Sequence, residues 1–229
     1  MTYGSLISQV MGESGVAAIY PSELDAVPIG FPVIQYRETD WELVKRLASR
    51  FEMSLYPEPT MGGAKLYVGL PETGTASYFE ESSYVAHRDE KFYTMGGDAA
   101  GRSRIQYLTY EVRSQEAYRV GEQTVFQGRS LYIGAKRCCV KGGQLEFTYV
   151  LSTREWTGAR QFNNEKISGM SLLGTVLGCE GQTVKLKLDI DKDHPDQNEK
   201  NAYPWLWAPT TGNVMYLMSQ TGTPGIPLL

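Results

Sequence analysis

Two alternating segments joined by a glycine pair constrain the fold of this chain more than any other feature. Apolar and polar side chains alternate along residues 145–151, with apolar members Leu145, Phe147, Tyr149 and Leu151. A period of two places one set on a buried sheet face. Residues 131–140 form a second such run, and Gly142 and Gly143 between the runs suit the positive φ angles of a tight turn. The sequence therefore predicts an antiparallel hairpin.

A second alternating pattern lies in the last third of the chain. Val184, Leu186, Leu188 and Ile190 alternate with polar residues, and a turn at Gly181 separates them from an earlier run that begins at Gly174. This pattern predicts two more antiparallel strands. Shorter runs predict strands over residues 33–36, 65–69 and 105–112. The proline-containing tail, residues 222–229, is not expected to form a strand, which would leave an unpaired edge beside residues 184–190.

The sequence indicates the start of one helix, at Thr39. The Thr39 hydroxyl can accept from the backbone N–H of Glu42 while the Glu42 carboxylate reaches back, and Glu38 and Asp40 place negative charge at the positive end of the helix dipole. A 3.6-residue period then predicts a buried face with Trp41 as an anchor. The face comprises Trp41, Val44, Leu47, Ala48 and Phe51. A short helix is also predicted over residues 3–10.

Composition supports a mainly β protein and excludes several functions. The chain of 229 residues contains 24 Gly and 15 Tyr and has a net charge of -4. A polyanion-binding protein needs a basic face, so no nucleic-acid partner is expected. The start of the chain lacks a signal peptide, and no apolar run approaches a membrane span, so we expect synthesis in the cytoplasm without a stable membrane anchor. The three cysteines are interpreted as reduced structural thiols.

Residues 36–48 resemble a known family. The run Tyr36-Arg37-Glu38-Thr39-Asp40-Trp41-Glu42-Leu43-Val44-Lys45-Arg46-Leu47-Ala48 resembles the Y-x-E-x-D-(W/L)-x-F-(L/x)-x-R-L-(A/L) segment of VgrG-like baseplate hub proteins, also called phage late control D-type tail proteins. Val44 departs from the aromatic or leucine common there. The segment from Gly174 through Val184 to Asp189 resembles the opening hairpin of the OB-fold barrel that follows the hub domain in that family.

The resemblance implies a domain order and a role. It implies a β-barrel-containing hub domain with one or two helices over residues 1–155, incomplete at its N-terminus, and a truncated OB-fold-like antiparallel barrel over 168–229. A connector over 156–167 joins them. The implied role is structural: a homotrimer in the baseplate of a contractile phage tail or a type VI secretion-like contractile injection system. Its partners would be the tail tube, spike and baseplate wedge proteins.

The residues give little support for catalysis. His87 lies in a segment expected to be an exposed polar loop, with Ser82, Ser83 and Asp89 as the only local partners for a catalytic role. Glu80 and Glu81 are adjacent, so in a strand their carboxyls diverge, whereas glycosidases need converging carboxyls. We therefore expect no enzymatic activity. Two alternatives stay open, a tail-associated cell-wall hydrolase and a β-rich carbohydrate-binding module.

No cofactor is expected, and a metal site is only weakly indicated. Asp189, Asp191 and Asp193 match the first three ligand positions of an EF-hand calcium loop. The later positions do not match the EF-hand loop, because His194 stands where glycine is needed and Lys200 where a bidentate glutamate is needed. Trp156, Trp205 and Trp207 are interpreted as core aromatics rather than as a sugar-stacking surface.

Overall fold

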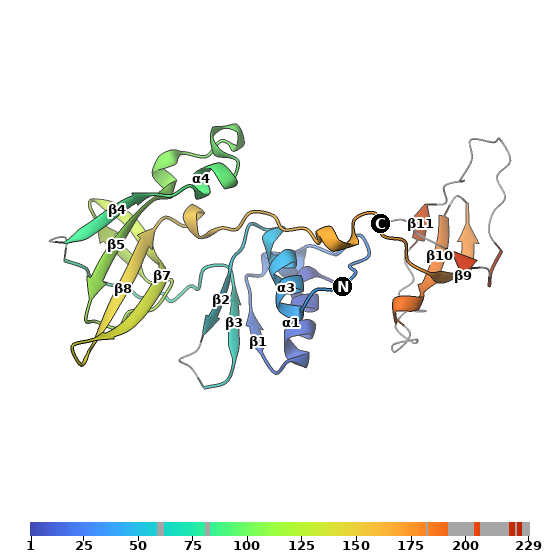
Figure 1. Cartoon of the computed structure of the whole chain (residues 1–229), viewed down its shortest axis with the longest axis horizontal. Coiled ribbons are helices and arrows are strands. Elements are labelled where there is room, and N and C mark those ends of the chain that lie inside the picture. The colour runs from blue at the N-terminus through green and yellow to red at the C-terminus, as the bar shows by residue number, and fades with distance from the viewer. Residues whose placement is uncertain are drawn as a thin grey trace. The chain divides into compact units, whose positions relative to one another are not determined.

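The computed structural model describes residues 1–58, 62–80, 83–181, 183–191, 204–206, 220–222 and 224–225. The chain is mainly β, as predicted, and forms two compact units (Figure 1). The first unit comprises Met1–Ile29 and Glu38–Asn163, and the second comprises Gly30–Arg37 and Asn164–Leu229. The boundary between the two units, after Asn163, lies inside the connector expected over residues 156–167. The assignment of residues 30–37 to the second unit had no signal in the sequence.

The first part of unit 1 combines helices with a small mixed sheet. Helices α1 (Tyr3–Glu13) and α3 (Asp40–Ser49) pack against each other, with the short α2 (Glu23–Ala26) beside α1. In the sheet, β3 (Lys65–Val68) pairs in parallel with β1 (Ala17–Ile19) and antiparallel with β2 (Leu55–Glu58). The helix predicted over residues 3–10 is confirmed and extends by one turn.

The second part of unit 1 is a five-stranded antiparallel sheet in the order β4-β5-β8-β7-β6. Its strands are β4 (Tyr84–Arg88), β5 (Leu108–Ser114), β6 (Gln123–Phe126), β7 (Arg129–Lys141) and β8 (Gln144–Ser152). The predicted hairpin is confirmed: Lys141 pairs with Gln144, and Gly142 and Gly143 have φ of 58° and 81°. In the described part the edge strands β4 and β6 do not pair with each other, but residues 75–77, which precede β4, form backbone hydrogen bonds with Gln123 of β6. The Tyr84 and Phe126 rings of the two edge strands meet edge to face, 5.4 Å apart.

Unit 2 contains an antiparallel sheet in the order β11-β10-β9-β12. The strands β9 (Gly174–Glu180) and β10 (Thr183–Leu188) form the predicted pair, and β11 (Pro204–Leu206) adds to β10. One expectation is wrong in part and another is wrong. The edge beside residues 184–190, expected to be unpaired, pairs with β11 at Val184 and Lys185. The proline-containing tail, not expected to form a strand, contributes β12 (Pro224–Gly225), which pairs with Thr175 and Gly174 of β9. An edge position explains this, because proline is tolerated where one side of a strand faces solvent.

Three further expectations about local structure are corrected. The chain has four α-helices in its described part rather than one or two, since α2 and α4 (Lys91–Thr94) are too short to give a periodic signal. Residues 104–107 form a 3₁₀ helix before β5, stabilised by a reciprocal cap between Ser103 and Gln106. Residues 33–36 are not a strand. Further short 3₁₀ helices are Gly97–Ala100, Glu155–Thr157, Glu165–Ile167 and Asp189–Asp191.

The described part of the chain contains no helix that is both long and apolar enough to span a bilayer.

A partly buried phenol on β2, that of Tyr56, predicts a pH dependence of stability. Burial raises the pKa of Tyr56 to about 12, against the opposing effect of its hydrogen bond with Thr157. The unfolded chain releases this proton near pH 10, so between pH 10 and 12 the folded protein binds more protons than the unfolded one. Stability therefore falls with rising pH in this window, by at most about 2 kcal/mol from this group.

The Tyr56→Phe variant isolates this contribution from the other tyrosines and lysines. Between pH 9.5 and 11.5, the free energy of unfolding in urea should fall less for the variant than for the wild type. Parallel pH profiles for the two proteins would show that Tyr56 titrates normally.

Candidate functional site

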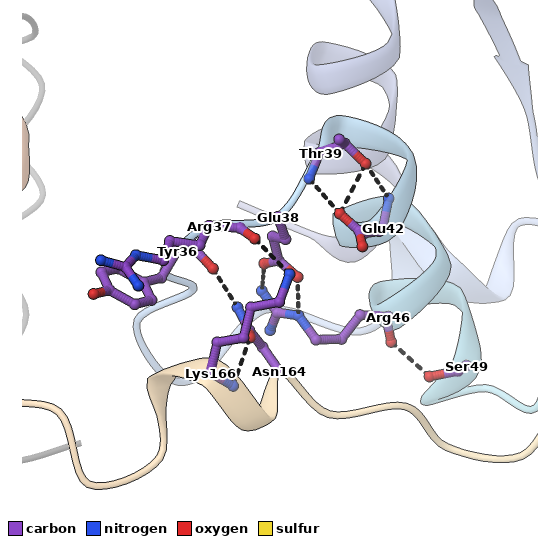
Figure 2. A network of polar contacts seen from close by, with 9 residues as sticks. All are labelled: Tyr36, Arg37, Glu38, Thr39, Glu42, Arg46, Ser49, Asn164 and Lys166. Atoms are coloured by element: carbon purple, nitrogen blue, oxygen red, sulfur yellow. Dashed lines mark hydrogen bonds and ion pairs between the residues drawn. The ribbon is translucent and has the colours of Figure 1, made fainter.

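The N-terminus of α3 is built as predicted. The Thr39 hydroxyl accepts from the N–H of Glu42 at 3.3 Å, and the Glu42 carboxylate accepts from the N–H of Thr39 at 2.7 Å (Figure 2). Asp40 accepts from the Ser14 hydroxyl just after α1, at 3.3 Å. The same residues that start α3 thus also join it to α1.

Glu38 has a role that the sequence did not reveal. Its carboxylate forms a two-pronged ion pair with Arg46, with Nε donating to Oε2 at 3.2 Å and Nη2 donating to Oε1 (Figure 2). The Glu38 side chain is 6% exposed and that of Arg46 is 13% exposed. Arg46 was expected on the solvent side of the helix. The pair instead fixes the segment before α3 to the second turn of the helix, a strong arrangement because its two hydrogen bonds are charge-assisted and bidentate.

The far end of α3 fixes a distant part of unit 1. The Ser49 hydroxyl donates to the Arg46 carbonyl at 2.7 Å and accepts from the N–H of Phe162 at 2.9 Å. The Lys45 ammonium lies over the Phe162 ring, 4.4 Å from its centre. Residues 158–162 therefore run alongside α3, although more than a hundred positions separate them in sequence.

Within unit 2, side chains bind the backbone of residues 36 and 37. Asn164 Nδ2 donates to the Tyr36 carbonyl at 2.8 Å, and the Lys166 ammonium donates to the Arg37 carbonyl at 2.7 Å (Figure 2). Arg37 has φ of 48°, which is uncommon for a residue with a side chain, and its guanidinium lies 5.4 Å from the Tyr36 ring centre. These side-chain bonds satisfy the two carbonyls without a neighbouring strand.

Trp41 is not the predicted anchor. Its side chain is 44% exposed, whereas Leu43, Val44, Leu47 and Ala48 carry the buried face of α3. Trp41 instead lines an open pocket of about 470 Å³ in unit 1. The remaining lining residues come from α3, from residues 53–55, from α4 with Met95, and from residues 158–162: Lys45, Met53, Ser54, Leu55, Lys91, Thr94, Met95, Gly158, Ala159, Arg160 and Phe162.

One cation of this pocket is held in a partly desolvated position. The Lys91 ammonium donates to the Trp156 carbonyl and lies 4.9 Å from the centre of the Trp156 ring. Burial lowers the pKa of Lys91, and the nearby Asp89 carboxylate opposes the shift. Asp89 also accepts from Trp156 Nε1 at 2.6 Å. Four separate segments form this pocket, so no local pattern in the sequence indicated it.

The candidate catalytic residues do not converge in the described part. His87 lies on the edge strand β4 rather than in a loop, and it is exposed, as is Glu80. Glu81 and Ser82 lie outside the described residues. Cys138, Cys139 and Cys179 are not in disulfides and are exposed.

The weak calcium candidates give no site in the described residues, which contain no cluster of three potential metal ligands. Asp189 begins a 3₁₀ helix, and its N–H donates to the Leu173 carbonyl at 2.8 Å. The side chain of Asp191 and all of Asp193 lie outside the described part. Trp207 also lies outside it, whereas Trp156 and Trp205 are partly buried against apolar clusters.

Two other motif positions of unit 2 have structural roles. Val184 is buried in the core of the sheet with Val176, Leu186 and Leu188. Gly174 faces the backbone of β10, where a Cβ atom would lie 2.6 Å from the Lys187 carbonyl oxygen. Only glycine fits this position without moving the strand.

Comparison with known proteins gives a likeness of fold. No protein-family model and no curated protein matches the chain. Among solved structures, it is similar to the 43 kDa tail protein of prophage MuSo2 from Shewanella oneidensis, with a TM-score of 0.53 and 10% identity over 71% of this chain and 66% of that one. A tail protein from Neisseria meningitidis MC58 matches with a TM-score of 0.47 and 12% identity, over 69% of this chain and 68% of that one.

Proposed function

We propose that this chain is a structural protein of a phage-type tail. The observation that carries the proposal is the fold that it shares with the tail protein of prophage MuSo2 over 71% of its length. Glu38, Thr39 and Arg46, which belong to the segment that resembles the hub family, form an ion pair and a capping box, so they have structural roles in the chain.

The finer proposal is a VgrG-like baseplate hub that assembles as a homotrimer. In this role unit 1 serves as the hub-like domain and the β9–β12 sheet of unit 2 as part of an OB-fold-like barrel. The tail tube, spike and baseplate wedge proteins are the proposed partners. The protein would be made in the bacterial cytoplasm and then built into a phage tail or an injection-system baseplate, acting through shape and association rather than catalysis.

Mass in solution tests the trimer. Light scattering at tens of micromolar protein should give three times the chain mass of 25.6 kDa. Because a ring about a threefold axis uses heterologous contacts, the mass should rise with concentration to this value and then stop. A strict monomer under these conditions would contradict the hub proposal.

Activity assays separate the proposed role from the two alternatives. The purified protein should not release soluble fragments from peptidoglycan and should not bind cell-wall oligosaccharides. Fragment release that disappears in the Glu80→Gln or His87→Ala variant would replace the structural proposal with a hydrolase.

A further inference from the structure

The pocket beside α3 is positively charged, although the chain as a whole is acidic. Its lining includes Lys45, Lys91 and Arg160 and no carboxylate, whereas the chain has a net charge of -4. Neither Lys45 nor Arg160 forms an ion pair with any described residue, and both are exposed. A concentration of one charge in a concave site raises the local potential for a partner of opposite charge.

Aromatic and aliphatic groups lie between these cations. The Lys45 ammonium and the Arg160 guanidinium lie 4.4 Å and 5.7 Å from the centre of the half-buried Phe162 ring. Exposed Trp41 adds a second ring. A volume of about 470 Å³ accommodates one or two side chains. The chemistry suits an aromatic side chain next to a carboxylate.

The chain carries that combination on its own surface, ahead of β4. Tyr78 is 76% exposed, the highest value among the exposed large hydrophobic side chains of the described part. Glu80 is also exposed and forms no ion pair with a described residue. Phe79 between them is buried against the rings of Tyr118 and Tyr149.

The backbone of residues 78–80 is fixed by contacts within unit 1. The Tyr118 hydroxyl donates to the Tyr78 carbonyl at 2.9 Å, and buried Phe79 fixes which residues point outward. Tyr78 and Glu80 therefore face solvent from an ordered backbone, which reduces the entropy lost on binding. Residues 78–80 of the same copy are not among the residues that line the pocket, so the proposed occupant is this segment of another copy.

We propose that the pocket lined by Trp41, Lys45, Arg160 and Phe162 binds Tyr78 and Glu80 of a second copy of this chain. The contact joins two different surfaces, so repetition generates a ring when the rotation closes. The inference rests on the self-association proposed above and assigns that association to a particular surface.

Charge reversal tests the contact from both sides. The pocket variant Lys45→Glu/Arg160→Glu and the segment variant Glu80→Lys should each weaken association at least about tenfold, because like charges then face each other. Combining the three substitutions in one chain restores opposite charges and should bring association back to within about fivefold of the wild type. The control Arg88→Glu/Lys141→Glu changes the net charge as the pocket variant does, at exposed positions outside the pocket, and should not alter association.

Neutral variants and urea unfolding curves distinguish loss of the contact from loss of folding. Tyr78→Ser and Trp41→Ala should weaken association while the midpoint of urea unfolding stays near that of the wild type, since both side chains are exposed. Sedimentation velocity over a concentration series measures association for all variants.

The outcomes separate this inference from the hub proposal. If the wild type is trimeric and the charge reversals leave it trimeric, the pocket contact is wrong and the hub proposal stands. If the wild type forms dimers or open filaments that the reversals abolish and the combined variant restores, the contact stands and the trimer is wrong. A monomeric wild type contradicts both.

Discussion

Replacing Phe126 by alanine should lower the free energy of unfolding by about 3–5 kcal/mol, the usual cost of removing a buried aromatic side chain. Phe126 is fully buried and lies 5.4 Å from Tyr84 and 5.3 Å from Tyr110, ring centre to ring centre. It stands on one edge strand of the five-stranded sheet and Tyr84 on the other, so the loss also removes the side-chain contact between these strands. Urea unfolding followed by near-ultraviolet circular dichroism measures the change.

The neighbouring residue provides a matched control. Val125 precedes Phe126 on the same strand, points to the opposite face and is 72% exposed. Val125→Ala should therefore change stability by less than about 0.5 kcal/mol. Similar losses for the two variants would mean that β6 is stabilised by its backbone pairing rather than by the aromatic cluster.

Replacing Arg46 by methionine should cost about 3–5 kcal/mol. The change keeps the apolar stem of the side chain but removes the guanidinium from a Glu38 carboxylate that is 6% exposed. A buried carboxylate that loses its counter-ion keeps its desolvation cost but loses the attraction that offset it. Chemical denaturation at neutral pH measures the loss.

Two further variants show whether the charge pair, rather than the size of the side chain, causes the effect. Glu38→Leu combined with Arg46→Met replaces both charges by apolar groups and should recover most of the lost stability. Lys45→Met alters an exposed neighbour whose ammonium lies over the Phe162 ring and should cost less than about 1 kcal/mol. A double variant as unstable as Arg46→Met alone would show that the pair does not act through its charges.

Local patterns determined the elements whose stabilising contacts lie close in sequence. The Thr39–Glu42 cap spans three positions, and the hairpin at Gly142 and Gly143 pairs residues that adjoin its turn. The β9–β10 pair likewise follows from alternation around one turn. In each case the side-chain period and the turn chemistry act within a few residues, so they can be recognised without knowledge of the rest of the chain.

Only the tertiary structure decided which side chains of α3 are buried. Helical periodicity placed Trp41 on the inner face and Arg46 outside, but Leu43 packs inward, Trp41 lines the pocket and Arg46 pairs with Glu38. A period gives the width of an apolar stripe, but the elements packed around a helix determine where its boundary falls. The pocket depends in the same way on residues 158–162, which Ser49 holds beside α3 through a hydrogen bond to Phe162. Sequence thus determined the local elements, whereas contacts between distant segments decided the burial of Trp41, the pairing of Glu38 and the existence of the pocket.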